Sequence, residues 1–176
     1  MNNRKSMRLQ NWDYTSPGYY FVTICIKNVG AGFPRPILGN AINGKMELNQ
    51  SGNIVNQCWH DLKIHFENIA LDYFMIMPDH IHGIIILKQS GGETPPLRIT
   101  LGHVIGYFKY QTTVQINKLN NNPGTILWQR NYYDHIIRNE QSLNEIRTYI
   151  NNNPSQWSLD KYNSPNSFVL PLKEIE

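Results

Sequence analysis

The stretch IALDYFMIMPDHIHGIIIL, residues 69–87, consists of two apolar runs separated by the pair Pro78-Asp79. Both runs are rich in β-branched and aromatic residues, and a Pro-Asp pair between such runs is typical of a tight turn. The stretch therefore predicts two strands, at 69–77 and 80–87, which lie side by side in an antiparallel sheet.

Strand and helix signals continue on both sides of this pair. GYYFVTICIK, residues 18–27, is apolar at both odd and even positions, which is typical of a strand covered on both faces. Asn43-Gly44 predicts the turn of a small hairpin, and Pro154 predicts the end of the last helix. The remaining predicted elements are hairpin strands at 39–42 and 45–48, helices at 51–68, 100–119 and 141–152, a loop at 88–98 and a last strand at 126–138.

This order of elements contains a split β-α-β-β-α-β core, which is the ferredoxin-like or RRM-like arrangement. We expect an α+β fold, an α/β sandwich in which helices back an antiparallel sheet, with two helices behind it. The 176 residues correspond to one domain. Its core spans about 17–157, and 158–176 form a C-terminal tail.

Composition narrows the function classes. Charged residues make up only 16% of the chain and the net charge is +3, a mild basic bias that fits a nucleic-acid partner and excludes strongly basic packaging proteins. The longest apolar stretch is far shorter than a bilayer span, and the N-terminus lacks an apolar signal sequence, so we expect a cytoplasmic protein without a membrane partner. Cys25 and Cys58 are isolated and are interpreted as small buried hydrophobes.

Two histidines, His80 and His82, stand one residue apart on the second strand of the opening stretch. Alternate residues of a strand share a face, so both imidazoles project to the same side, about 7 Å apart along the chain, where they can chelate one ion. We expect Ile81, Ile84 and Ile86 to point to the opposite, buried face. A pair at this spacing also arises by chance in a chain with six histidines, so the spacing alone leaves a structural role open.

A third donor is offered by the last predicted helix, in IRTYINNNPSQW. Tyr149 and Asn153 are four residues apart, so a phenol and a carboxamide lie on one helical face, one turn apart. Such a face presents a nucleophile and a metal ligand together. The same residues also fit a tyrosine packed on the sheet and an asparagine that caps the helix before Pro154.

With these residues in place, the chain resembles the HUH endonucleases, and more closely the REP-associated tyrosine transposases and their insertion-sequence relatives. The matching strings are MPDHIHGIIIL (77–87), WQRNYYDHIIRNE (128–140) and YINNNP (149–154), together with SPGYYFVTICIKN (16–28). They extend over most of the chain, and three ordered motifs are far more specific than the histidine pair alone.

The resemblance implies a metal-dependent single-stranded DNA endonuclease and strand transferase, a transposase that acts near DNA hairpins through a 5′-phosphotyrosine. His80 and His82 match the histidines that bind a divalent metal, Mg²⁺ or Mn²⁺. Tyr149 matches the catalytic tyrosine, and Asn153 the polar residue that completes the metal ligands, where many insertion-sequence members have Gln. Insertion-sequence relatives are dimers, whereas REP-associated relatives can act as monomers, so the resemblance implies either a monomer or a homodimer.

Further residues are assigned from their chemistry. Asp79 is a candidate hydrogen-bond partner of a metal-binding histidine, and His135 is expected to orient the tyrosine helix through a hydrogen bond. Aromatic and cationic side chains that alternate near the last strand are typical of a surface that stacks bases and binds phosphates. The candidate DNA contacts are Trp128, Arg130, Tyr132, Arg138, Lys109 and Arg8.

Three other functions fit the same residues. The first is a non-catalytic single-stranded DNA- or RNA-binding module on the same scaffold, which needs no metal. The second is an HUH replication initiator, although such proteins usually carry additional modules. The third is a simple hydrolase that uses His80, His82 and water and forms no adduct with DNA.

Overall fold

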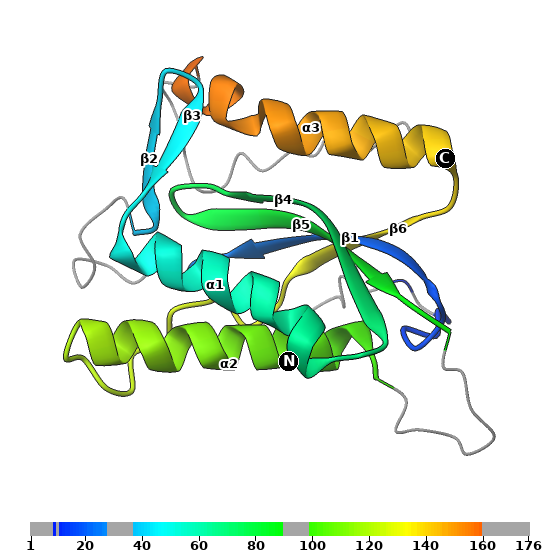
Figure 1. Ribbon diagram of the computed structural model, residues 1–176, viewed down its shortest axis with the longest axis horizontal. Helices are drawn as coiled ribbons and strands as arrows, with labels where there is room; N and C mark the ends of the chain where they lie inside the picture. Colours follow the sequence, from blue (N-terminus) through cyan, green and yellow to red (C-terminus); the bar gives the residue numbers. More distant parts are fainter. Residues whose placement is uncertain (1–8, 10, 28–36, 90–98, 160–176) are drawn as a thin grey trace, which may run out of the picture.

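The computed structural model describes residues 9, 11–27, 37–89 and 99–159. Arg8, most of the predicted loop at 88–98 and residues 160–176 of the predicted tail lie outside the described residues. Three helices and six strands follow one another along this part of the chain (Figure 1). They are β1 Gly18–Cys25, β2 Gly39–Ile42, β3 Lys45–Leu48, α1 Gln50–His65, β4 Ile69–Ile76, β5 His80–Leu87, α2 Leu101–Leu119, β6 Tyr133–Ile137 and α3 Glu140–Leu159.

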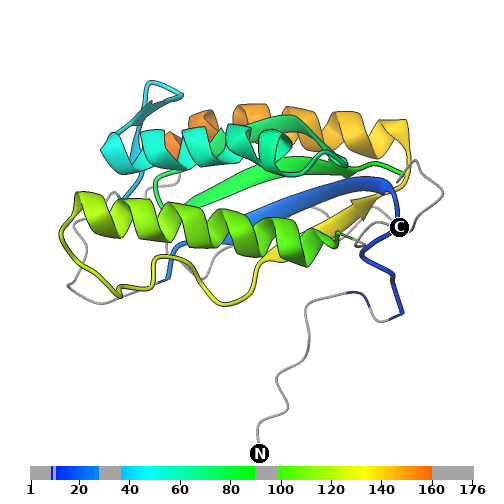
Figure 2. The ribbon, with the colours of Figure 1, turned by 60° about the horizontal axis from the view of Figure 1, so that its bottom comes forward.

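The sheet has the strand order β4-β5-β1-β6, and all its pairs are antiparallel. Together with α1 and α2, these strands form the predicted β-α-β-β-α-β core, so the α+β, ferredoxin-like fold is confirmed. Helices α1 and α2 cover one face, as expected, and α3 covers the other (Figures 1 and 2). The molecule therefore has three layers, and the sheet is shielded on both sides.

The main core lies between the sheet and the α1/α2 layer. Tyr20, Val22 and Ile24 of β1 point into it and are fully buried. Trp59 of α1 stacks on Phe74 of β4 with ring centroids 4.4 Å apart. This side of the sheet supplies most of the apolar burial of the described residues.

A smaller apolar cluster lies between the sheet and α3. It consists of Phe21, Ile84, Ile137, Leu143, Ile146 and Ile150. The expectation that Ile84 and Ile86 face away from the histidines is wrong, because the two-residue period of a strand places both on the histidine side. Ile81 does lie in the main core, as predicted.

Two predicted boundaries need correction. The strand expected at 126–138 is ordered as sheet only over Tyr133–Ile137; before it, Trp128 makes an isolated bridge to Ile26. The predicted stop at Pro154 is also wrong, because α3 runs through this proline to Leu159 and takes up the start of the predicted tail. Proline lacks an N–H group and costs helix stability, so tertiary contacts must stabilise the last turns.

One such contact is the hairpin of β2 and β3. Its turn residues Asn43 and Gly44 have φ values of 51° and 73°, which confirms the predicted turn. A Cβ on Gly44 would lie 2.8 Å from Ser155 Oγ of α3, so the turn fits closely against this helix. The hairpin thus stands beside the C-terminal half of α3 (Figure 1).

Two composition-based expectations can also be compared with the structure. Cys25 and Cys58 are both free; Cys58 is buried, whereas Cys25 is only partly buried. Burial, aided by the carboxylate of Asp79, raises the pKa of the Cys25 thiol to about 11. None of the helices in the described ranges is long and apolar enough to cross a membrane.

Candidate active site

Strand β5 brings two histidines together on the face covered by α3. His80 is 4% exposed and His82 is fully buried. Their Nε2 atoms are 3.1 Å apart, and the ring centroids are 4.6 Å apart. Both rings therefore direct the same nitrogen toward one point.

The second nitrogen of each ring has a fixed partner. Asp79 Oδ1 lies 2.8 Å from His80 Nδ1, and because a carboxylate only accepts, the neutral His80 ring carries its proton on Nδ1. The lone pair of His80 is then on Nε2. Thr23 Oγ1 lies 2.9 Å from Nδ1 of His82 on the neighbouring strand β1. A hydroxyl accepts as well as donates, so Thr23 is compatible with a lone pair on Nε2 of His82 too.

Burial determines the charge of His82. Loss of solvent, together with the neighbouring His80 ring, lowers the pKa of His82 well below its ordinary value. The ring is therefore neutral at neutral pH. A neutral imidazole is the form that binds metal ions.

Helix α3 places Tyr149 against this pair. The helix begins after Asn139, whose side chain accepts from the Ser142 N–H at 2.7 Å. The Tyr149 ring lies 5.3 Å from the His82 ring and 6.1 Å from that of Phe21, edge-on to both. Burial raises the pKa of the Tyr149 phenol, and a hydrogen bond from Asn153 opposes this shift. The phenol is protonated at rest and needs help to ionise.

Tyr149, Asn153 and Trp157 form a stripe on α3 at successive helical turns. Asn153 is 8% exposed, and its side-chain amide is hydrogen-bonded to the phenol of Tyr149. The ring centroid of Trp157 lies 5.7 Å from that of His80. Asn153 is thus not the end cap of the helix, since α3 continues for six more residues.

Sequence reasoning missed Trp157, Thr23 and Phe21 as parts of this site. Phe21 stacks on His82 with centroids 5.5 Å apart. The signals for two of them were present in the sequence. Trp157 stands eight residues after Tyr149, and Thr23 is the one aliphatic hydroxyl in the apolar run of β1.

The donor set fits a small divalent cation. Two nitrogen ligands at about 2.1 Å in neighbouring octahedral positions are about 3.0 Å apart, close to the 3.1 Å between the Nε2 atoms. Over the ranges that the structure describes, no group of three or more His, Cys, Asp or Glu side chains surrounds a common point. Among the described side chains of this face, the carbonyl oxygen of Asn153 is the candidate for a third ligand.

Two of the candidate DNA contacts, Trp128 and Lys109, make contacts within the protein instead. Trp128 is 3% exposed and donates from Nε1 to Thr112 Oγ1 at 2.7 Å, so the DNA-contact prediction for it is wrong and it is a core residue. Lys109 Nζ donates to the carbonyls of residues 129 and 131 at 2.9 and 3.0 Å. Its ammonium stabilises the chain before β6, a role that the charge pattern did not predict.

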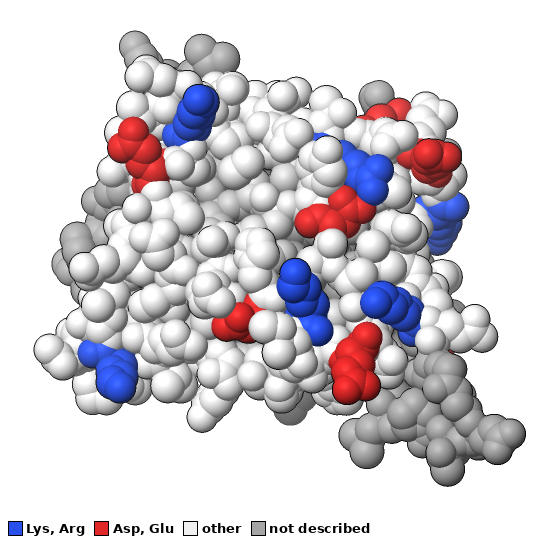
Figure 3. Space-filling view, viewed as in Figure 1, with Lys and Arg blue, Asp and Glu red and all other residues white. Residues whose placement is uncertain are grey.

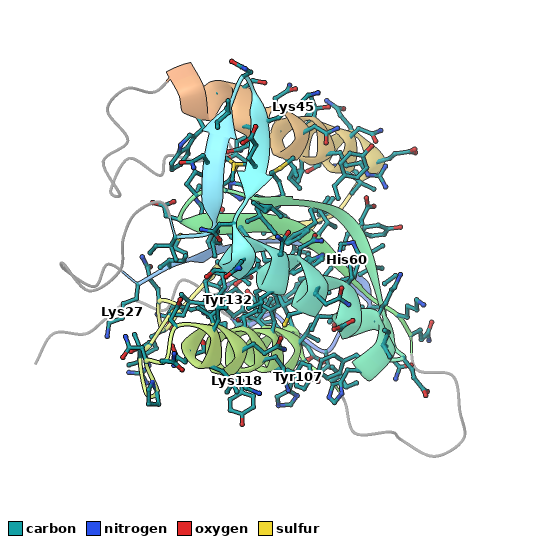
Figure 4. The ribbon with its side chains drawn as sticks, turned by 60° about the vertical axis from the view of Figure 1, so that its left-hand side comes forward. Lys27, Lys45, His60, Tyr107, Lys118 and Tyr132 are labelled. Carbon is teal, nitrogen blue, oxygen red and sulfur yellow. The ribbon has the colours of Figure 1, made fainter. Side chains whose placement is uncertain are left out.

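Other candidates remain on the surface. Tyr132 lies beside α2 (Figure 4). Lys109 Nζ lies over its ring, 5.5 Å from the centroid. Arg130 and Arg138 are exposed. The N–H of Gln129 donates to the carbonyl of Cys25, the residue of β1 that pairs with His80. Arg130 therefore follows directly after a residue that contacts this end of β1. The face in Figure 3 carries scattered described charges of both signs rather than a continuous basic surface.

His135 does not make the expected contact. Its strand pairing with Phe21 places it on the face of α3, but within the described ranges its ring has no hydrogen bond, so the predicted bond to the tyrosine helix is absent. Burial and the nearby Arg138 lower the pKa of His135.

Comparisons with known proteins identify the family of the chain. The family model described as "Transposase IS200 like" matches residues 49–153. An uncharacterized protein of Haemophilus influenzae is 40% identical over 175 residues, which cover 92% of this chain and 93% of the relative. A second protein of that organism, named "Putative REP-associated tyrosine transposase", is 25% identical over 147 residues, 81% of this chain and 73% of its own length.

A solved structure has the same fold. It is described as a REP-associated tyrosine transposase bound to a REP hairpin, and it matches with a TM-score of 0.58 and 17% identity over 85% of this chain and 74% of the other. The family match includes β5 and most of α3, the elements that carry the two histidines and Tyr149. The chain therefore belongs to the family of IS200-like transposases.

Proposed function

We propose that the protein is a metal-dependent single-stranded DNA endonuclease and strand transferase that uses Tyr149 as its nucleophile. One observation carries the proposal. The phenol ring of Tyr149 lies against His82, whose Nε2 atom converges with that of His80. A nucleophile and a pair of metal-type ligands thus share one largely buried face.

The chemistry follows from the residue types. Tyr149 Oη attacks the phosphorus of a DNA phosphodiester in line with the leaving 3′-oxygen. The bond to the 3′-oxygen breaks, a 5′-phosphotyrosine forms, and the proton lost by the phenol is balanced by one gained at the new 3′-hydroxyl. The reverse reaction with the 3′-hydroxyl of another strand joins DNA without ATP, because the phosphotyrosine conserves the bond.

The residues around Tyr149 divide the remaining tasks. Asn153 donates to the phenol oxygen and so favours its ionised form against the effect of burial. His80 and His82, with the Asn153 carbonyl oxygen, are the residues that would hold Mg²⁺ or Mn²⁺. When bound, such an ion offsets negative charge on the phosphate and the leaving oxygen. Thr23 and Asp79 orient the two rings for this purpose.

The proposed substrate is hairpin DNA with a single-stranded flank. The structural relative was described with a REP hairpin, which makes a hairpin the first substrate to test. Arg130 is exposed near the end of β1 that pairs with His80, and it is a candidate phosphate contact. In this function, an unpaired DNA strand binds at the face of the sheet that carries His80 and His82.

The test uses hairpin DNAs with randomised single-stranded flanks, labelled and incubated with Mn²⁺, then separated by denaturing electrophoresis. We expect a covalent protein–DNA band with the wild-type protein. Tyr149→Phe removes the nucleophile and retains the ring, so the band disappears while DNA binding persists. His82→Ala and added chelator remove the band as well.

Mass spectrometry of the digested adduct is expected to place the nucleotide on the peptide that contains Tyr149. Cleavage without an adduct would contradict the tyrosine mechanism and identify a hydrolase. Binding without cleavage across the whole panel would instead identify a nucleic-acid-binding module.

A further inference from the structure

Arg147 of α3 and Asp72 of β4 form an ion pair between the third layer and the sheet. We infer that this pair positions the tyrosine helix, fixing α3 along and around its axis so that Tyr149 faces His82. The inference rests on the proposed function, because it concerns the placement of the nucleophile in that reaction.

Strand β4 has a β-bulge at Asp72. The register of β4 against β5 shifts by one residue between Leu71 and Phe74, so Asp72 and Tyr73 together stand opposite one residue of β5. The main-chain N–H of Tyr73 donates to Asp72 Oδ1 at 2.7 Å. Such bulges redirect side chains and are frequent beside active sites. This bulge allows the Asp72 carboxylate to reach α3.

Arg147 meets the carboxylate with two nitrogens. Nε donates to Oδ1 of Asp72 at 3.2 Å, and Nη2 donates to Oδ2. Nη1 donates to Asn144 Oδ1 one turn earlier on α3 at 3.2 Å, and the guanidinium lies over the Tyr73 ring, 5.5 Å from its centroid. The Asp72 side chain is 11% exposed and that of Arg147 is 31% exposed. All arms of the guanidinium are therefore engaged at one place.

The other contacts of α3 with the sheet are less directional. Ile146 and Ile150 pack in the small apolar cluster, and apolar contacts permit a helix to slide or rotate slightly. A two-point guanidinium–carboxylate pair prefers one plane and one distance, so it restricts both movements. Of the described contacts, this one is the most suited to set the register of the helix.

The pair lies close enough to Tyr149 to control its position. Arg147 precedes Tyr149 by two residues, a rise of about 3 Å along a helix. A rigid helix therefore transmits a shift at Arg147 to the phenol. Since a misplacement of about 1 Å can reduce a rate by about 100-fold, losing the pair should slow the chemical step.

The test compares the wild-type chain with Arg147→Met, Arg147→Lys and Asp72→Asn. Lys63→Met is the control, because it removes an exposed positive charge from the last turn of α1. Two quantities are measured on the full chain: the rate of adduct formation at saturating hairpin DNA with Mn²⁺, and the amide hydrogen exchange of residues 140–157.

We expect Arg147→Met and Asp72→Asn to slow adduct formation by about 10- to 100-fold. The dissociation constant for the hairpin stays unchanged, and amide exchange accelerates in α3 but not in β5. Arg147→Lys keeps the charge but loses the two-point geometry, so its rate falls between those of Arg147→Met and the wild type. Lys63→Met behaves like the wild type.

Each contrary result has a separate meaning. A wild-type rate and wild-type exchange in Asp72→Asn would overturn the inference. Weaker DNA binding by Arg147→Met, with an unchanged rate at saturation, would overturn it and make Arg147 a DNA contact. If the wild type forms no adduct with any hairpin, the proposed function fails. Exchange then decides the docking role alone: faster exchange of α3 in both variants supports it, and unchanged exchange overturns it.

Discussion

Gly83 follows His82 directly in β5, and the structure predicts that even a methyl group cannot be added there without cost. A Cβ on Gly83 would lie 2.4 and 2.5 Å from two atoms of the Trp59 indole. The indole has little room to move, because it is stacked on Phe74 at 4.4 Å and meets Phe108 edge-on at 5.6 Å. Gly83→Ala therefore forces a displacement in the main core.

The size of the effect follows from these distances. Carbon atoms in contact are about 3.5 Å apart, so the indole or β5 must move by about 1 Å. Overpacking of this kind costs about 1–3 kcal/mol. Replacing a strand glycine recovers about 0.5–1 kcal/mol of that, so the middle of the two ranges gives an expected loss of about 1–2 kcal/mol. For a chain of this length the Tm falls by about 2–8 °C.

Calorimetry and urea unfolding of purified variants measure this loss. Gly106→Ala is the matched control, because Gly106 is exposed on α2 and a Cβ there meets nothing within 4 Å. It should stabilise the protein by about 0.5–1 kcal/mol, since alanine is the better helix former. The same substitution thus has opposite signs at two sites.

A double-mutant cycle isolates the cause. Trp59→Leu shortens the side chain that meets the new methyl group, so in this background Gly83→Ala should cost much less, with a coupling energy of at least about 1 kcal/mol. Equal costs of Gly83→Ala with and without Trp59, or a cost below about 0.5 kcal/mol in the wild type, would refute the packing argument.

Three further predictions concern the site and its surroundings. Because burial lowers the pKa of His82, the unfolded chain binds a proton below about pH 6.5 that the folded chain does not. With chelator present, the free energy of unfolding should decrease as the pH is lowered below this value. The decrease should be smaller in His82→Gln. Thr23→Val removes the partner of His82 Nδ1, so Mn²⁺ affinity measured by titration calorimetry should fall by about 10- to 100-fold; an unchanged affinity would exclude this role of the hydroxyl. Lys109→Met should destabilise the fold by about 1–3 kcal/mol with an unchanged salt dependence of DNA binding, whereas Arg130→Met should reduce that dependence if Arg130 contacts phosphate.

The elements and the family could be predicted from the sequence because local signals agreed with the fold. The apolar runs around Pro78-Asp79 form β4 and β5, and the Asn43-Gly44 turn forms as expected. The spacing of Tyr149 and Asn153 also predicts that both side chains share one helical face. In the structure, the Asn153 amide is hydrogen-bonded to the Tyr149 phenol. These features depend on residues within a turn or two of one another.

What could not be predicted depends on contacts distant in the chain. Pro154 is a helix breaker by local rules, yet α3 continues because its end packs against the β2/β3 hairpin, more than a hundred residues away. The sequence predicts a base-stacking role for Trp128, which is buried, because alternation with cations does not reveal which aromatic residues lie in the core. The orientation of Ile84, by contrast, follows from the sequence alone, because residues 80, 82 and 84 share one face of a strand.

The layered architecture also separates the stability of the fold from the integrity of the site. Most buried apolar side chains lie between the sheet and α1/α2, whereas α3 is held by a small cluster, the Arg147–Asp72 pair and the hairpin. Regions with fewer buried contacts open at lower free energy than the whole fold. Because the histidines belong to the sheet and Tyr149 to α3, partial opening of this layer would separate nucleophile from ligands while the main core stays intact. In the proposed reaction, the same opening would let an unpaired DNA strand reach the histidines, which are otherwise buried.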